Sequence, residues 1–222
     1  MHGSVANAAI TFSEQRPLEE RFDVVYHTRS GYPPGPARET IDFEEQADDL
    51  VRDLRDGDHL VGHSYGAVVS LLAAARGPAL ASLTVSEPPA FGLALDDPAV
   101  QEFLRAYESF RPRTPREYLE LFLPLVGSSV PDDLSPELEQ GARAAMAERT
   151  PDQAQIPLDA LHAAPFPKLV ISGAHSAAFD AVCDVLEREL PAQRAVLPGA
   201  GHSLPRAPGY NDVLADFVDR AS

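Results

Sequence analysis

The stretch Val61-Gly62-His63-Ser64-Tyr65-Gly66-Ala67 sets the architecture expected for the rest of the sequence. The short run 58–61, which ends in two apolar residues, leads into it, and an alanine-rich, almost entirely apolar run from 67 to 75 follows it. This order predicts a strand, a sharp turn and a helix, which is the context in which Gly-x-Ser-x-Gly holds a serine hydroxyl above the end of a sheet. The two glycines lack side chains where the strand and helix backbones approach each other. Ser64 is therefore the candidate nucleophile.

A helix that begins directly after Ser64 would also supply positive charge where a reaction needs it. Its first backbone N–H groups have no partner within the helix, and they point toward the serine together with the positive end of the helix dipole. The oxygen of a carbonyl group becomes negative there when the serine attacks it. The pattern therefore favours nucleophilic attack on a carbonyl over a chance Gly-x-Ser-x-Gly in a turn.

Length and charge limit the classes of protein to consider. The 222 residues are enough for one globular domain with a substantial core. The net charge of -16 argues against a nucleic-acid partner, because phosphate contacts need clustered Lys and Arg. No apolar run approaches the ~20 residues of a membrane span, and no charged start with an apolar run suggests export. With Cys183 as its single cysteine, the chain is expected to be cytoplasmic and to bind no membrane.

Three landmarks together resemble the α/β-hydrolase family. They are His2-Gly3-Ser4 near the start, the motif from Gly62 to Gly66, and Gly201-His202 near the end, and they come in the family's order over nearly the whole chain. The resemblance implies a mostly parallel sheet flanked by helices, a helical lid and serine-hydrolase chemistry. It does not identify a substrate, because the fold hosts esterases, lactonases, thioesterases, C–C hydrolases, haloperoxidases and members that hydrolyse nothing.

The remaining apolar runs predict strands that alternate with helices. The expected strands are Phe22–Tyr26, Leu80–Val85, Lys168–Ser172 and Arg194–Leu197, and the expected helices are 41–54 with Thr40 as N-cap, 158–162, 177–190 with Cys183 as a small buried residue, and 211–220 with Asn211 as cap. Such alternation predicts a parallel α/β sheet covered by helices on both faces. Ligands bind at the carboxyl ends of the strands in such sheets, where Ser64 is expected.

The start of the chain departs from this pattern. In hydrolases of this type His-Gly ends a buried strand, but here Met1 stands directly before His2. We expect either a sheet that lacks its N-terminal strands or a chain begun too late, and the alternative is that residues 1–11 are a frayed terminus. The resemblance implies that the backbone N–H groups of Ser4 and Tyr65 are the oxyanion donors. An exposed sheet edge also makes pairing into a homodimer a reasonable hypothesis.

The regular alternation stops between residues 90 and 156. The sequence there is helical, is interrupted by prolines, and contains more apolar residues than a small helical hairpin needs. We predict a hydrolase core of residues 1–89 and 157–222 with a helical lid at 90–156. Some apolar residues of the lid, such as Phe91, would line a substrate pocket over Ser64. The alternative is that they only attach the lid to the core.

His202 is the expected general base, because the glycines around it form a loop that can hold an imidazole over Ser64. The carboxylate that would orient His202 and stabilise its charged form is less obvious. The family usually has an aspartate in a Gly-x-x-Asp pattern after the strand 168–172, but Ser176 stands there. Glu87, at the end of the neighbouring strand, is the leading replacement. Asp180 and the absence of any acid are the alternatives.

Two other histidines, His63 and His175, are expected to shape the pocket or bind substrate. No cluster has the spacing of a metal site, and no glycine pattern suits a dinucleotide, so neither a metal nor a cofactor is expected. The sequence predicts a serine hydrolase that cleaves a small or medium apolar carboxylic ester or lactone through an acyl-enzyme. The alternatives are a cofactor-free lyase or cyclase on the same fold, and a catalytically silent binding protein.

Overall fold

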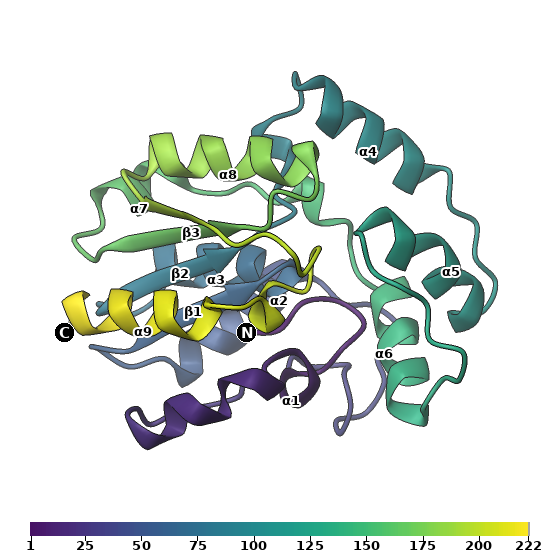
Figure 1. Ribbon diagram of the computed structural model, residues 1–222, viewed down its shortest axis with the longest axis horizontal. Coiled ribbons are helices and arrows are strands. Elements are labelled where there is room, and N and C mark those ends of the chain that lie inside the picture. Colours follow the sequence, from purple (N-terminus) through teal and green to yellow (C-terminus); the bar gives the residue numbers. More distant parts are fainter. Residues whose placement is uncertain (222) are drawn as a thin grey trace.

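A parallel sheet of four strands lies at the centre of the computed structural model, which describes residues 1–221 (Figure 1). The strands are β1 (His59–His63), β2 (Ser82–Ser86), β3 (Lys168–Ser172) and β4 (Gln193–Val196), and they pair in chain order. His63 is in register with Ser86, and Ser86 with Ile171. The carboxyl ends of β1, β2 and β3 therefore lie level at one edge of the sheet. The predicted parallel α/β architecture is confirmed.

Helices cover both faces of this sheet. The larger apolar core lies on the face covered by α2 (Phe43–Asp53), α3 (Tyr65–Arg76), α7 (Leu158–Ala163) and α8 (Ala177–Glu189). A second core on the opposite face packs α9 (Tyr210–Ala221) and the 3-10 helix Ser13–Glu20 against β3. Every residue of β2 and β3 is buried, because both faces of these inner strands are covered.

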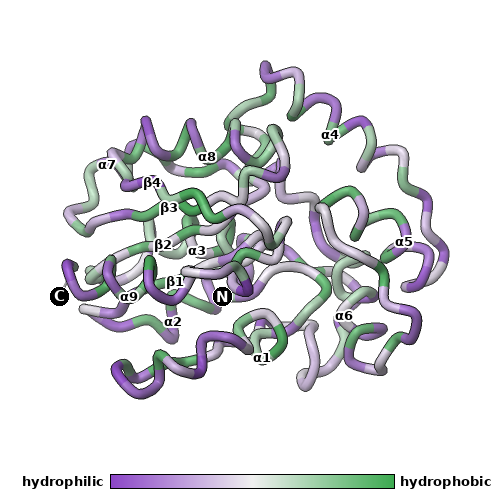
Figure 2. The backbone as a smooth tube through the Cα atoms, in the orientation of Figure 1, coloured by the Kyte–Doolittle hydropathy of each residue, from purple (hydrophilic) through white to green (hydrophobic). Residues whose placement is uncertain are grey.

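The central strands of the sheet are largely hydrophobic, whereas outer turns of helices such as α4 and α8 carry hydrophilic residues (Figure 2). α3 is buried from Tyr65 to Ala74, which explains why its sequence is apolar on all sides rather than along one stripe. Cys183 in α8 is also fully buried, as expected for a small apolar side chain. Within residues 1–221, no helix has both the length and the apolar character that crossing a bilayer requires.

The predicted strand Phe22–Tyr26 does not form. A cavity of about 530 Å³ lies between this segment and β1, and Val25 is 80% exposed beside it. The run has the composition of a strand, but a strand also needs a neighbour within hydrogen-bonding distance, about 4.8 Å away. Pairing of two copies through the outer edge of β1 stays a hypothesis.

Met1 takes the place beside the last residues of β1. Its amino group donates a hydrogen bond to the Val61 oxygen at 2.6 Å, and its own oxygen accepts one from the His63 N–H at 3.0 Å. Met1 and His2 are both buried, and α1 (Ala8–Thr11) follows them. The alternative of a frayed terminus over residues 1–11 is therefore wrong.

Three helices follow β2 before the chain returns to the sheet. They are α4 (Pro98–Glu108), α5 (Pro115–Leu125) and α6 (Pro136–Met146), with 3-10 turns at Phe91–Leu93 and Pro151–Gln153. Each helix begins with proline after a capping Asp, Thr or Ser, which explains why this segment combines many prolines with helical structure. Figure 1 shows the three helices grouped at one end of the molecule. The division into core and lid stays a prediction, and residue 222 lies outside the described residues.

Two predicted caps are wrong. Asp42, and not Thr40, caps α2 by accepting a hydrogen bond from the Glu44 N–H. α9 begins at Tyr210, so Asn211 lies inside the helix, where its side chain instead contacts the 3-10 helix at Glu14 and Gln15. Long-range contacts of this kind are not visible in a local sequence pattern.

Candidate active site

Strained turns follow three neighbouring strands, all at the carboxyl end of the sheet. Ser64 follows β1, Glu87 follows β2 and Ala174 comes two residues after β3, and their φ angles are 54°, 43° and 50°. Non-glycine residues rarely adopt positive φ, and the strain persists only where the surroundings enforce it. Strained residues gather at active sites, so this edge of the sheet is the candidate functional region.

The turn at Ser64 requires both of its glycines. A Cβ on Gly62 would lie 2.7 Å from the Cα of Ala67, which confirms the close strand-to-helix contact expected at this position. A Cβ on Gly66 would instead overlap the carbonyl oxygens of Met1 and His2. The second glycine therefore makes room for the N-terminal loop and not for β1.

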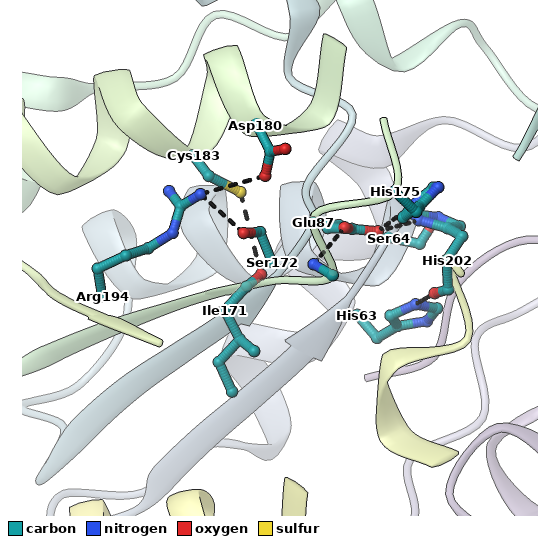
Figure 3. Close-up of polar contacts among 11 residues, drawn as sticks. His63, Ser64, Glu87, Ile171, Ser172, His175, Asp180, Cys183, Arg194 and His202 are labelled. Atoms are coloured by element: carbon teal, nitrogen blue, oxygen red, sulfur yellow. Dashed lines mark hydrogen bonds and ion pairs between the residues drawn. The ribbon is translucent and has the colours of Figure 1, made fainter. Parts of the chain in front are cut away.

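The structure brings Ser64, His202 and Glu87 into one hydrogen-bonded chain (Figure 3). The Ser64 Oγ lies 2.7 Å from the His202 Nε2, and the His202 Nδ1 lies 2.7 Å from the Glu87 Oε2. All three side chains are buried. With Glu87 ionised, the His202 Nδ1–H donates to the carboxylate, so the Nε2 is free to accept the serine proton.

The alternative acid, Asp180, lies elsewhere. Its carboxylate is 3.4 Å from the Arg194 guanidinium, which also donates to the Ser172 hydroxyl (Figure 3). Among the described residues, His202 has Glu87 as its carboxylate partner, and Ser176 stands at the N-cap position of α8 without a capping hydrogen bond from its side chain.

Glu87 is held by three hydrogen bonds. One oxygen accepts from the Gly173 N–H at 2.7 Å, and the other accepts from the His175 Nε2 at 2.8 Å as well as from His202. Burial opposes ionisation of this carboxyl group, but the hydrogen bonds from His175 and His202 and their electrostatic attraction to the carboxylate outweigh it and lower its pKa to about 2. Glu87 is therefore a fixed anion that can stabilise an imidazolium at His202.

The loop that carries His202 is fixed from several sides. The backbone N–H of His202 donates to the Val126 oxygen at 3.3 Å, and the backbone oxygen of His202 accepts a hydrogen bond from the His63 Nε2 at 2.6 Å. Burial lowers the pKa of His63 to about 3, so this imidazole is neutral. The Phe179 ring lies 4.4 Å from the His202 ring. The imidazole is thus prevented from turning away from Ser64.

The two expected oxyanion donors, Ser4 and Tyr65, line the same cavity as Ser64. Within residues 1–221, the Ser4 N–H has no hydrogen-bond acceptor. Tyr65 is the first residue of α3, and such a residue has no acceptor for its N–H inside the helix. A Cβ on Gly3 would lie 2.7 Å from the Ser64 Cβ, so the N-terminal loop packs directly against the serine.

The cavity over Ser64 is small, at about 40 Å³. Aromatic rings make up much of its wall, namely Phe91, Phe103, Tyr107, Tyr118, Phe122 and Phe179. A cavity of this size and lining has room for a small apolar group next to Ser64.

Phe91 lies in the cavity wall, as the sequence predicted, but His63 and His175 do not. Both imidazoles hydrogen-bond to other parts of the site, His63 to the His202 oxygen and His175 to Glu87. That these two histidines shape the pocket or bind substrate stays a prediction.

Sequence reasoning missed Glu148, which lines the cavity and hydrogen-bonds to Ser4. It lies 144 residues from Ser4 in an alanine-rich region, so no local pattern marks it. The contact of His175 with Glu87 was missed too. The departure at Gly173-Ala174-His175-Ser176 was the available signal, since it leaves room for a different partner there.

One group among the described residues has the composition of a metal site. The ligand atoms of Glu87, His175 and His202 lie within 4.8 Å of one another. Both imidazole nitrogens lie 2.7–2.8 Å from the same carboxylate oxygen, which are hydrogen-bond distances. The three side chains are therefore already paired with one another.

A serine, an imidazole and a carboxylate in sequence above a parallel sheet form the arrangement of a serine hydrolase triad. The model of the alpha/beta hydrolase family matches residues 1–216, and the chain belongs to this family. No curated protein matches the chain.

Solved structures show the same fold. A lipase-esterase related protein from Clostridium acetobutylicum has a TM-score of 0.71 at 15% identity, covering 98% of this chain and 92% of its own. Est816, an N-acyl homoserine lactone degrading enzyme, has a TM-score of 0.67 at 22% identity, covering 98% and 91%. A thermophilic esterase from Thermogutta terrifontis has a TM-score of 0.66 at 20% identity, covering 99% and 88%.

Proposed function

We propose that the protein hydrolyses a small apolar carboxylic ester or lactone through an acyl-enzyme. The observation that carries this proposal is the chain of two 2.7 Å contacts from Ser64 through His202 to Glu87. Membership of the alpha/beta hydrolase family supports hydrolysis in general. The likeness to a lipase-esterase related protein, an esterase and a lactone-degrading enzyme favours carboxylic esters among the possible bonds.

In the first half of the reaction, the Ser64 oxygen attacks the carbonyl carbon while the His202 Nε2 takes the serine proton. Glu87 stabilises the imidazolium that results. The N–H groups of Ser4 and Tyr65 donate hydrogen bonds to the carbonyl oxygen, which is negative in the tetrahedral intermediate. When the intermediate collapses, the imidazolium gives its proton to the leaving alcohol and the acyl group stays on Ser64.

In the second half, a water molecule takes the place of the alcohol. The oxygen of this water attacks the acyl carbon while His202 accepts a proton from the water. His202 then gives that proton to the Ser64 oxygen when the acyl–serine bond breaks. A carboxylic acid leaves, and the enzyme returns to its starting state. In a lactone the alcohol and the acid belong to one molecule, so the same steps open the ring.

The cavity supports a short acyl group. Its volume of about 40 Å³ and its aromatic wall favour acetyl or a similarly small apolar group next to the scissile bond. Phe103 on α4 and Phe122 on α5 are part of the cavity wall, so we expect longer acyl chains to contact these two helices.

A fluorophosphonate probe and p-nitrophenyl acetate test this proposal together. We expect the probe to label Ser64 and the ester to be hydrolysed, with Ser64→Ala abolishing labelling and lowering kcat by about 10⁴-fold or more. The surface variant Ser109→Ala, in which an exposed hydroxyl is removed, is the matched control and should behave as the unchanged protein.

The alternatives give different results in the same assay. Turnover that survives Ser64→Ala would favour a lyase or cyclase, in which the serine does not attack. Neither labelling nor turnover over a panel of small esters and lactones would favour a silent binding protein.

A further inference from the structure

A buried carboxylate from the helical segment 90–156 reaches the loop that carries Ser4. Glu148 follows α6 by two residues, and its side chain is 6% exposed. Its Oε2 accepts a hydrogen bond from the Ser4 hydroxyl at 2.5 Å. Glu148 and Ser4 both line the cavity over Ser64, so this contact lies at the wall of the active site.

The other oxygen of Glu148 holds the same loop one residue further on. It accepts a hydrogen bond from the Tyr32 hydroxyl at 2.8 Å, and that hydroxyl in turn accepts one from the Val5 N–H at 3.4 Å. The Ser4–Val5 peptide is thus connected to one carboxylate through both of its residues. Neither contact involves the Ser4 N–H, which stays available to a substrate oxygen.

The loop needs such support, because its own backbone is strained. Val5 has a φ of 72°, a left-handed conformation that a β-branched residue adopts only where its surroundings enforce it. Helix α6 packs so closely on the loop that a Cβ on Gly141 would overlap the Val5 oxygen. The segment 90–156 therefore determines the shape of the loop through both a side chain and a backbone contact.

The carboxylate is held in turn by Arg29. The guanidinium is fully buried, forms an ion pair with Glu148, and lies over the rings of Tyr32 and Tyr65 at 4.6 Å and 4.3 Å. Burial raises the pKa of Glu148, whereas the Arg29 charge and the hydrogen bonds from Ser4 and Tyr32 oppose that rise. An arginine from the core and a glutamate from the helical segment are thus buried as a pair.

We propose that Glu148 is a positioning residue: it fixes the Ser4 N–H as an oxyanion donor, so the seating of segment 90–156 on the core becomes a condition for the reaction. The inference rests on the proposed hydrolysis. An oxyanion donor is effective only when it is already oriented before charge develops, and a loop that could move would lose this advantage. Glu148 acts through Ser4 and does not need to touch the substrate.

The first test removes the serine hydroxyl and keeps its backbone N–H. In Ser4→Ala we expect kcat for p-nitrophenyl acetate to fall about tenfold to 100-fold with KM within about twofold, because the donor stabilises the transition state more than the bound substrate. Ser4→Thr keeps a hydroxyl and should restore most of kcat. Because Ser4→Ala leaves the Arg29–Glu148 pair intact, it avoids an unpaired buried charge.

The second test examines whether Glu148 acts through that hydroxyl. Glu148→Gln should lower kcat by a similar factor, and the double variant with Ser4→Ala should be no slower than the slower single variant, because both changes break one contact. Glu137→Ala removes an exposed carboxylate of α6 and is the control that should leave kcat unchanged.

The outcomes separate the inference from the proposed function. Ser64-dependent hydrolysis with unchanged kcat in both Ser4→Ala and Glu148→Gln would overturn the positioning role and leave the hydrolysis standing. Additive losses in the double variant, or a rise in KM instead of a fall in kcat, would also overturn it. No Ser64-dependent hydrolysis at all would overturn both proposals.

Discussion

The carboxyl end of β1 and its outer edge differ in how completely their polar groups are paired. At the carboxyl end, the Ser64 N–H donates to the Ser86 oxygen at 2.9 Å, and the Ser64 hydroxyl contacts His202. Along the outer edge, Met1 is the one residue among 1–221 that pairs with the strand, and a cavity of about 530 Å³ lies beside this edge. The geometry of the site therefore depends on β2, β3 and the N-terminal loop, and not on a further strand beside β1.

This difference predicts that changes at the carboxyl end alter catalysis or the protonation of the groups that support it, whereas changes along the outer edge alter stability and leave catalysis nearly unchanged. Three experiments examine the contrast.

The largest effect is expected at Glu87. Glu87→Gln keeps the shape of the side chain but removes the charge that stabilises the His202 imidazolium, so kcat should fall about 10³- to 10⁴-fold. The matched control is Asp180→Asn, whose carboxylate contacts Arg194 instead, and kcat should then change less than about twofold. Steady-state kinetics on p-nitrophenyl acetate measure both. Equal losses in the two variants would contradict the assignment of Glu87 as the acid.

A smaller effect is expected in the pH dependence of stability. The pKa of His63 is about 3 in the folded protein and 6.5 in a model peptide. Between these values the unfolded chain binds a proton that the folded chain does not, so the free energy of unfolding falls as pH drops from about 6.5 toward 3. For one group the slope is about 1.4 kcal/mol per pH unit.

Urea unfolding at pH 6 and pH 4.5 measures this slope. His63→Gln keeps a hydrogen-bond donor for the His202 oxygen and removes the titrating imidazole. Its free energy of unfolding should therefore fall by about 2 kcal/mol less between pH 6 and pH 4.5 than that of the unchanged protein. His59→Gln, at the first residue of β1, is the control, because His59 is only partly buried and its removal should flatten the slope less. Glu87 makes no large contribution in this range, since its stabilisation is lost only as pH falls from 4.5 toward 2. Identical slopes in all three proteins would refute the neutral state of His63.

The smallest change in activity is expected at the outer edge. Leu60 is buried and borders the cavity, so Leu60→Ala should lower the free energy of unfolding by about 2 to 3 kcal/mol, near the lower limit for such changes because part of the surroundings is already open. We expect kcat to stay within about twofold. Val25→Ala, at an exposed position across the cavity, should alter stability by less than about 0.5 kcal/mol. A large loss of kcat in Leu60→Ala would show that the two regions are coupled.

The same contrast explains what the sequence could predict. The turn at Ser64 and the strand Lys168–Ser172 are local features, because glycine spacing and continuous apolar runs are sufficient to define them. The segment Phe22–Tyr26 has a similar apolar run, but whether it becomes a strand depends on what lies beside it. Local patterns contain no information about that neighbour.

The residues of the site likewise fall into those that a local sequence pattern predicts and those that it does not. Ser64 and His202 could be predicted from the glycines that flank them, and Glu87 from its position at a strand end. The hydrogen bond of His175 to Glu87 and that of Glu148 to Ser4 join residues 88 and 144 positions apart. The first contact joins the residues that follow β2 and β3, and the second joins the segment 90–156 to the N-terminal loop. Neither pairing is contained in a local sequence pattern, so both required the structure.

Cys183 gives the protein an internal reporter of its own opening. It is the single sulfhydryl in the chain, it is inaccessible between α8 and β3, and burial raises its pKa, which keeps it in the unreactive thiol form. A thiol-specific dye can react there only after α8 has separated from the sheet beneath it. The labelling rate therefore records how often that helix detaches, without any engineered probe.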